Sequence, residues 1–414
     1  MYAGQSISIP SETTLASRRS LLGAPTRPIS ATDDLKLACA FEAPESLSAN
    51  ITAQWPVLAD QAAEPNCFAE RWFLQPSLAM LAEPGEVKLA VVTSTSGLLV
   101  GLIPLTIETD YGRIPIRYVQ NWTHHHSFLD APLVRRGMEG RFWQTLLEAL
   151  DDTDWATGLL HFRGLPAGGR IVRGLEQASA ALDRPCDIVH RTRRAVLRSD
   201  KTPDDYWTSI VRKKKRKEIN RLANRLSELG EVSYATLGAE DDVAPWIDAF
   251  LDLESEGWKG TAGSALSCEP KLAKFFEIIA TGAHAAGKLD FHRIDLDGKP
   301  IAMLVNFLTA PGGFSYKIAF DESYARYSPG ILIERYNLRI LERRDIEWLD
   351  SCAQPGHSMI DSLWAERRDI VRVSVPLGGR GQRAVFRACR SAENMASRLR
   401  GIAEKIRSPD NGGD

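Results

Sequence analysis

Residues 289–361 decide the fold that the sequence predicts, and they read LDFHRIDLDGKPIAMLVNFLTAPGGFSYKIAFDESYARYSPGILIERYNLRILERRDIEWLDSCAQPGHSMID. An alternating segment at 289–294 and an apolar run at 301–308 flank the turn signal Asp297-Gly298. This pattern predicts two antiparallel strands joined by a tight turn. A Pro-Gly-Gly break then precedes a third predicted strand at 314–320. The stretch therefore begins as three consecutive strands.

A helix is predicted to follow these strands at Ser328-Pro329-Gly330. Serine is a good N-cap residue, and proline suits the first helical position because the N–H group that it lacks would have no partner there. Gly330 leaves the first turn open to close approach, and the free backbone N–H groups of a helix start can bind a phosphate. The sequence therefore predicts either an anion-binding helix start or simply a well-capped helix.

The composition of the chain is typical of a soluble globular protein. It has 414 residues, of which 44% are hydrophobic and 25% charged, and its net charge is -2. This length is enough for two domains, and the charge argues against a surface built as a whole for nucleic acid. The six cysteines are scattered singly, and no apolar run reaches the length that a bilayer requires. We therefore expect reduced thiols, no zinc site, no disulfide scaffold and a cytoplasmic protein.

The two halves of the chain show the same order of predicted elements. Helices, a hairpin, a third strand, a loop, a helix and a strand occur in 51–163 and again in 242–350. This order predicts an α+β fold built from two copies of one unit, each with a mixed, mainly antiparallel sheet flanked by helices. The predicted parts are a mobile N-terminal arm (1–35), an N-terminal domain (36–200), a C-terminal domain (201–380) and a basic C-terminal segment (381–414).

A predicted helix at 203–229 carries a basic run at 212–217 between the two copies. The run has three interpretations: a solvated face, a patch for a phosphorylated acceptor or an anionic membrane surface, and a nucleic-acid site. The last is disfavoured because no aromatic residues are interleaved with the basic ones. Three adjacent histidines, 124–126, cannot all face one ion in an extended segment, so we expect a polar loop that lines a cleft between the halves, and no metal site.

Several motifs of the C-terminal half together resemble those of one enzyme family. They are Trp-Lys-Gly-x-x-Gly at 258–263, Lys-Ile-Ala-Phe-Asp at 317–321, Tyr-Ser-Pro-Gly at 327–330, and Leu-Asp-Ser-Cys at 349–352 with His357, Asp361 and Trp364. The set resembles GNAT-superfamily acetyltransferases of the CelD-like, cellulose-biosynthesis type, which are relatives of the Fem-type aminoacyl transferases. The resemblance covers most of 200–372 and is weaker over 36–200.

The resemblance implies a tandem GNAT fold that transfers an acyl group to an amine or hydroxyl. The co-substrate would be acetyl-CoA or another acyl-CoA, with no metal. The acyl-pantetheine would lie between two diverging strands, and the next helix start would receive the pyrophosphate. The implied cofactor-binding residues are Ile318, Ala319, Phe320, Arg326, Ser328, Gly330 and Ile331.

The expected catalytic groups are a base for the acceptor and a proton donor for the leaving thiolate. Asp350 and His357 are the favoured pair, and Tyr316 and Tyr327 are the phenol candidates. Capping of a turn by Asp350 and of a short helix by Asp361 are the alternative interpretations. The residues expected to contact the acceptor are Glu254, Trp258, Lys259, Lys317, Asp321 and Asp361.

Three functions remain open on this basis. The first is acyl-CoA-dependent N- or O-acyl transfer in polysaccharide or cell-envelope synthesis, with a small or carbohydrate-linked acceptor. The second is Fem-type transfer from aminoacyl-tRNA, although no long coiled-coil arm for tRNA is predicted. The third is a GNAT-like component of an exopolysaccharide machine that has no catalytic activity.

Overall fold

The computed structural model describes residues 36–111, 114–256, 266 and 269–407. The predicted N-terminal arm, Trp258 and Lys259 lie outside the described residues. Thirteen strands of the described chain join in one sheet. They are β1 (Leu37–Glu42), β2 (Lys88–Ser94), β3 (Leu99–Glu108), β4 (Tyr118–Asn121), β5 (Leu133–Val134), β6 (Leu159–Pro166), β7 (Asp187–Leu197), β8 (Val232–Thr236), β9 (Leu289–Leu296), β10 (Lys299–Thr309), β11 (Gly312–Phe320), β12 (Trp348–Asp350) and β13 (Glu366–Pro376).

The pairing of these strands is the same when it is read from either edge of the sheet. The order is β1-β2-β3-β4-β6-β13-β7-β12-β11-β10-β9-β8, with β5 beside β3. From each edge, three antiparallel pairs lead to one parallel pair, β4 with β6 or β11 with β12. Antiparallel pairs then lead to the centre, where β13 meets β7. This symmetry confirms the predicted α+β fold of two related units.

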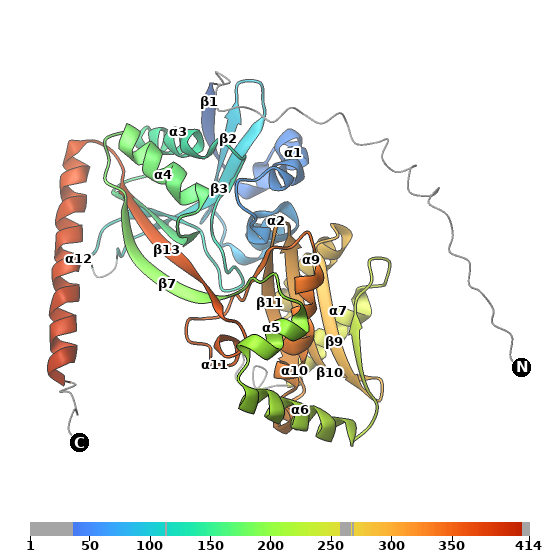
Figure 1. The fold of residues 1–414 in the computed structure, drawn as a ribbon. Coiled ribbons are helices and arrows are strands. Elements are labelled where there is room, and N and C mark those ends of the chain that lie inside the picture. The colour runs from blue at the N-terminus through green and yellow to red at the C-terminus, as the bar shows by residue number, and fades with distance from the viewer. Residues whose placement is uncertain (1–35, 112–113, 257–265, 267–268, 408–414) are drawn as a thin grey trace, which may run out of the picture. The chain divides into compact units, whose positions relative to one another are not determined.

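The two units exchange a strand at the centre of the sheet. β7 follows the elements of the N-terminal half but pairs with β12 of the C-terminal half, while β13 pairs with β6 of the N-terminal half. β7 and β13 also pair with each other over a long ladder, and Figure 1 shows them side by side. Each half therefore borrows its innermost strand from the other, which places residues distant in sequence in direct contact.

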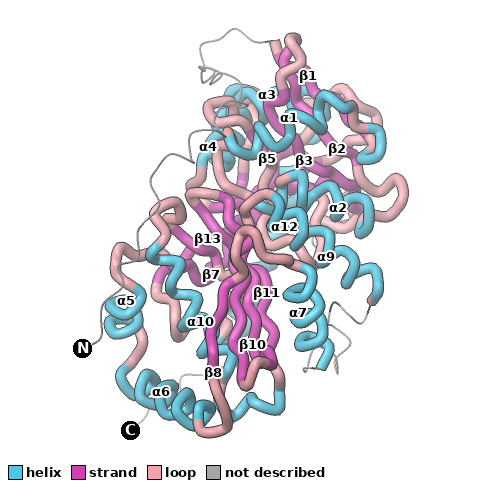
Figure 2. Tube along the Cα trace, turned by 90° about the vertical axis from the view of Figure 1, so that its right-hand side faces the viewer, coloured by secondary structure: helices cyan, strands magenta, loops and turns pink. Residues whose placement is uncertain are grey.

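Helices cover the sheet within each half. α3 packs on β1, β2 and α4 in the N-terminal half, whereas α7 and α10 pack on β10 and β11 in the C-terminal half. α2 and α9 contact each other and so connect the halves, and α9 also contacts α7 (Figure 2). The described helices are α1 (Ala49–Asp60), α2 (Arg71–Leu81), α3 (Glu139–Asp151), α4 (Arg170–Ala181), α5 (Pro203–Ile210), α6 (Lys213–Ser227), α7 (Ala244–Glu256), α9 (Pro270–Ala285), α10 (Pro329–Asn337), α11 (Ser358–Asp361) and α12 (Arg380–Arg407).

The predicted helix at 203–229 is divided in the structure, so that part of the prediction was wrong. Thr202 caps α5 by accepting a hydrogen bond from the Asp205 N–H group. Val211 then takes an extended conformation and is only 2% exposed, and Arg212 is extended as well before α6 begins. Burial of the β-branched Val211 side chain thus outweighs the helical periodicity, which sequence patterning cannot reveal.

None of the described helices has both the length and the apolar character that crossing a membrane requires.

Candidate functional site

The strands β11 and β12 separate soon after they meet. Their parallel pairing joins Gly312–Phe314 to Trp348–Asp350 and ends there, while β11 continues to Phe320. The first turn of α10 lies against the end of β11, since a methyl group added at Gly330 would be 3.5 Å from the Phe320 ring and 3.8 Å from Ile318. The chain thus forms diverging strands with a helix start at their open end.

The start of α10 differs from the predicted serine cap. Ser328 has the left-handed conformation (φ 56°), and its side chain makes no capping hydrogen bond. Its N–H donates to the Ala325 carbonyl at 2.9 Å, and the Ile331 N–H donates to the Ser328 carbonyl at 2.9 Å. Within the described chain, the Gly330 N–H has no such acceptor. Of the three predicted phosphate donors, Gly330 is therefore the one whose N–H group makes no hydrogen bond within the described chain, although the residue as a whole is buried.

Three further predicted residues lie in the segment before this helix. Tyr327 is buried in the core of the C-terminal half, next to residues such as Leu332. The exposed Arg326 places its guanidinium 4.8 Å from the Tyr327 ring centre. Asp321, at the end of β11, accepts hydrogen bonds from the backbone and hydroxyl of Ser323 and so fixes the turn before α10. These contacts give all three residues a role in holding the loop in shape.

A polar cluster lies beside this loop, between β11 and α7. The Lys317 ammonium is 3.5 Å from Glu254 Oε1, and Glu254 Oε2 accepts a hydrogen bond of 2.8 Å from the Leu266 N–H. Tyr316 is 4% exposed, and its hydroxyl has no hydrogen-bond partner among the described residues. Burial, reinforced by the negative charge of Glu254, raises the Tyr316 pKa well above its ordinary value. The cluster thus combines a carboxylate, an ammonium and a phenol that stays protonated.

The predicted histidine loop of the N-terminal half approaches the same cluster. Burial lowers the pKa of His126 to about 4, and the charge of Lys317 contributes to this shift. Burial also lowers the pKa of His124 to about 3, and its ring stacks on Phe73. Both imidazoles are therefore neutral at pH 7. No group of acidic, histidine or cysteine side chains in the described chain is arranged to hold a metal ion.

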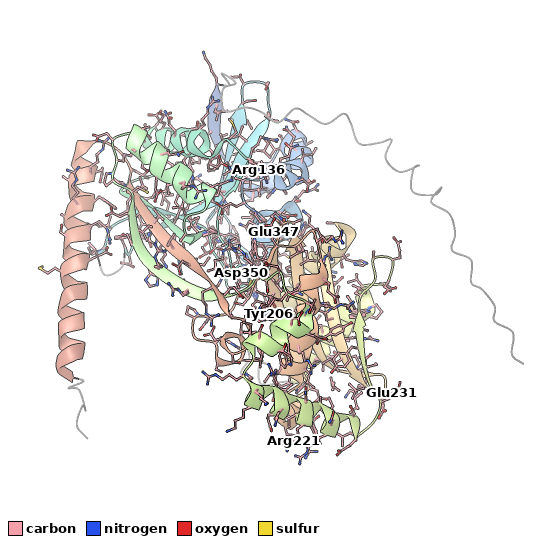
Figure 3. The ribbon with its side chains drawn as sticks, viewed as in Figure 1. Arg136, Tyr206, Arg221, Glu231, Glu347 and Asp350 are labelled. Atoms are coloured by element: carbon pink, nitrogen blue, oxygen red, sulfur yellow. The ribbon has the colours of Figure 1, made fainter. Side chains whose placement is uncertain are left out.

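Asp350 lies at the end of β12, where it is fully buried (Figure 3). Its Oδ2 accepts hydrogen bonds from Arg194 (2.8 Å) and Arg368 (3.0 Å), and its Oδ1 lies 2.7 Å from Arg194 Nε and accepts from the Cys352 N–H at 3.0 Å. The two arginines come from the exchanged strands β7 and β13. Each Asp350 oxygen thus already has two partners, which leaves neither oxygen with a free position for a substrate proton. Asp350 is therefore the centre of a buried ion-pair cluster, and its role as the general base stays a prediction.

His357 and Asp361 lie at the two ends of the short helix α11. His357 is exposed, and its Nδ1 accepts a hydrogen bond of 3.4 Å from the Ile360 N–H, which makes it the N-cap of α11. Asp361 ends the same short helix and forms an ion pair with Arg367 at 3.2 Å. His357, rather than Asp361, therefore caps this helix, while its partnership with Asp350 in catalysis stays a prediction.

Residues 213–357 match the family model of the acetyltransferase (GNAT) domain. The protein is therefore an acyltransferase. The matched segment includes β11, the start of α10 and the Glu254–Lys317 pair.

Two solved structures share the fold of this protein over most of its length. FemX is 8% identical with a TM-score of 0.50, over 77% of this chain and 95% of FemX. A conserved protein of unknown function from Bacteroides thetaiotaomicron VPI-5482 is 13% identical with a TM-score of 0.50, over 81% of this chain and 99% of that one. No curated protein matches the sequence.

The N-terminal half repeats the diverging strands of the GNAT domain but closes them. β4 and β6 are parallel over Val119–Gln120 and Leu160–His161. Beyond these residues the Asn121 side chain bridges the gap, because it donates to the Arg163 carbonyl and accepts from the Arg163 N–H, both at 2.9 Å. At the start of α3, Glu139 accepts a hydrogen bond from the Gly137 N–H at 3.1 Å. In this half a side chain thus bridges the gap beyond the parallel pair, and a carboxylate stands at the start of the helix.

Proposed function

We propose that the C-terminal half transfers an acyl group from an acyl-CoA to an amine or hydroxyl of an acceptor. The separation of β11 from β12, with the start of α10 at its open end, carries this proposal. The acyl-CoA supplies the activated acyl thioester. The protein binds it, orients the acceptor and moves the proton.

In this proposal the cofactor lies along the free end of β11. The pantetheine arm runs past Ile318, Ala319 and Phe320, and the pyrophosphate meets the Gly330 N–H and the positive end of the α10 dipole. Asn121 and Glu139 occupy the corresponding positions of the N-terminal half. We therefore assign acyl-CoA binding to the C-terminal half alone.

Glu254 takes the place of Asp350 as the general base in this proposal. It is 2% exposed, and the Lys317 ammonium at 3.5 Å orients one of its oxygens. The acceptor nitrogen or oxygen attacks the thioester carbon while Glu254 takes its proton. The carbon–sulfur bond breaks, and the protonated Tyr316 donates its proton to the departing sulfur.

The acceptor in this proposal is a small or carbohydrate-linked molecule. The resemblance to CelD-like acetyltransferases supports a carbohydrate-linked or other small acceptor in polysaccharide or cell-envelope synthesis in the cytoplasm. Trp258 and Lys259 stay predicted acceptor residues. The exposed lysines of the 212–217 run in and before α6 would suit a phosphate group of the acceptor or an anionic membrane surface.

The fold shared with FemX supports a second candidate, aminoacyl transfer from a charged tRNA. The basic helix α6 would then contact RNA. Activity that disappears on treatment with RNase, with no turnover of acetyl-CoA, would favour this candidate. Activity with acetyl-CoA that RNase leaves intact would exclude it.

The proposal is tested by titrating acetyl-CoA into the wild-type protein and two matched variants in a calorimeter. Gly330 and Gly140 both occupy the second position of their helices, α10 and α3. A methyl group fits at both, because its nearest neighbours would be 3.5 Å away, and alanine favours a helix by about 0.5–1 kcal/mol over glycine.

We expect Gly330→Ala to weaken acetyl-CoA binding by about tenfold or more, because the methyl group keeps the phosphate from the N–H. Gly140→Ala should bind as the wild type does. Equal affinities for all three proteins, or no binding at all, would refute the assignment.

A further inference from the structure

A groove with a volume of about 1010 Å³ lies between the start of α4 and the exchanged strands β7 and β13. One wall is the Gly168-Gly169 turn with Arg170 and Arg173 of α4. This turn lies near Glu64, whose Oε1 accepts a hydrogen bond of 2.9 Å from the Ile171 N–H. The helix start is thus already capped by a carboxylate, and any ligand must be held by the side chains around it.

The opposite wall is formed by side chains of the exchanged strands. β7 and the residue just after it contribute Arg191, Arg193 and Arg198, and β13 contributes Arg367 and Arg368. The whole lining contains seven arginines and three acidic residues, which leaves an excess of four positive charges. The chain as a whole has a net charge of -2, so this excess is local.

The arginines of the groove differ in how they are already engaged. Arg191 and Arg193 share the single carboxylate of Asp369, at 2.8 and 3.0 Å. The exposed guanidinium groups of Arg170 and Arg198 form no ion pair or hydrogen bond within the described chain. Like charges around a concave surface repel one another unless an anion offsets them. The groove therefore presents guanidinium groups on both walls that a bound anion would stabilise.

We propose that this groove binds a small molecule that carries two or more phosphate groups. A planar guanidinium matches phosphate with two parallel hydrogen bonds, which makes clustered arginines better suited to phosphate than lysines would be. A single phosphate could engage one wall, whereas a diphosphate can bridge the arginines of both. The volume is also that of a small-molecule site.

The groove is separate from the proposed acyl-CoA site, yet one residue connects it to the GNAT domain. Arg368 lines the groove, lies 4.5 Å from the Trp348 ring centre and donates to Asp350 at 3.0 Å. Trp348 in turn packs on Phe314 of β11, with ring centres 5.5 Å apart. Phosphate binding in the groove therefore does not depend on the proposed transfer reaction.

The test is calorimetric titration of inorganic pyrophosphate into the full-length protein at low and at physiological salt. The groove variant is Arg170→Gln/Arg198→Gln, which breaks no contact of the described chain. The control is Lys271→Gln/Arg387→Gln, two exposed residues of α9 and α12 outside the groove, which removes the same charge elsewhere.

We expect the wild-type protein to bind pyrophosphate and the groove variant to bind about a hundredfold more weakly, roughly tenfold for each arginine. The control should stay within about twofold of the wild type. The inference would be overturned if the folded wild-type protein did not bind pyrophosphate, or if both variants lost the same affinity for it. It would also be overturned if the groove variant kept its affinity, because pyrophosphate would then bind at another site such as α10. An oligouronate, whose negative charges are carboxylates, is titrated as a second probe. If it bound more tightly than pyrophosphate, the groove would prefer carboxylate to phosphate, and the inference would be overturned. Acetyl-CoA binding by Gly330→Ala is measured independently, so failure of one proposal leaves the other testable.

Discussion

Replacing Asp350 by asparagine distinguishes the ion-pair cluster from a catalytic base. The side chain keeps its shape, but its negative charge is lost between Arg194 and Arg368, whose side chains are 11% and 18% exposed. One carboxylate oxygen also becomes an NH₂ group that points at a guanidinium. The variant therefore leaves two largely buried positive charges without their counter-ion.

The expected cost follows from this burial. Removing one partner of a buried ion pair destabilises a protein by about 3–5 kcal/mol. The arginines here keep a small solvent contact, and Arg194 also donates to the Phe128 carbonyl at 2.7 Å, so the lower end of that range, about 3 kcal/mol, is expected. Because β7 and β13 supply the two arginines, the loss should loosen the centre of the sheet.

Urea unfolding followed by circular dichroism measures this change. The control is Asp369→Asn, since Asp369 pairs with Arg191 and Arg193, which are 49% and 68% exposed. A pair that solvent screens in this way is worth less than about 1 kcal/mol. If Asp350→Asn unfolds like the wild type but abolishes acyl transfer, the structural interpretation is wrong and Asp350 is a catalytic residue.

Three further variants test the site and the core. Tyr316→Phe should lower kcat by about 10²-fold or more, because the proton donor is lost. The free energy of unfolding should stay unchanged or rise, because the buried hydroxyl has no partner in the described chain. An undiminished kcat would exclude Tyr316 as the donor. Glu254→Gln should lower kcat by about 10²–10⁴-fold and leave acetyl-CoA affinity unaltered, whereas full activity would favour a component without catalysis. Burial raises the pKa of Glu334 from 4.5 to about 7, so the folded protein holds a proton that the unfolded chain releases. Stability should therefore fall by roughly 3 kcal/mol as the pH rises from 4.5 to 7, and Glu334→Gln should remove that slope in urea titrations at several pH values.

Local sequence patterns were enough to predict β9, β10 and β11 and the position of α10. The turn at Asp297-Gly298 and the run at 301–308 depend on neighbouring residues, and β9 and β10 follow them. The division at Val211 and the edge strand β8 could not be predicted, because burial against distant residues decides the first and pairing with β9 the second. The patterns therefore predicted elements well where local interactions dominate.

The role of Asp350 shows why site residues were harder to predict. Asp350 does lie at the end of a strand, but the sequence does not show which residues it contacts. Arg194 is 156 residues away in sequence, and Arg368 reaches Asp350 through the exchange of β13 into the other half. Consecutive arginines at 193–194 and 367–368 were the available signal, and charged pairs within central strands would have pointed to a buried counter-ion.

The difference between the two halves supports the proposal that only the C-terminal half binds acyl-CoA. Each parallel strand pair leaves backbone groups that must find hydrogen-bond partners, either within the chain or from a ligand. In the N-terminal half the Asn121 amide satisfies the groups beyond β4, and Glu139 places a negative charge in the first turn of α3, where it would repel a phosphate. In α10 the same helical position is Pro329, which brings no charge, and the Gly330 N–H is left to a ligand. Asn121 and Glu139 are thus two side chains by which the N-terminal half differs from the half proposed to bind acyl-CoA.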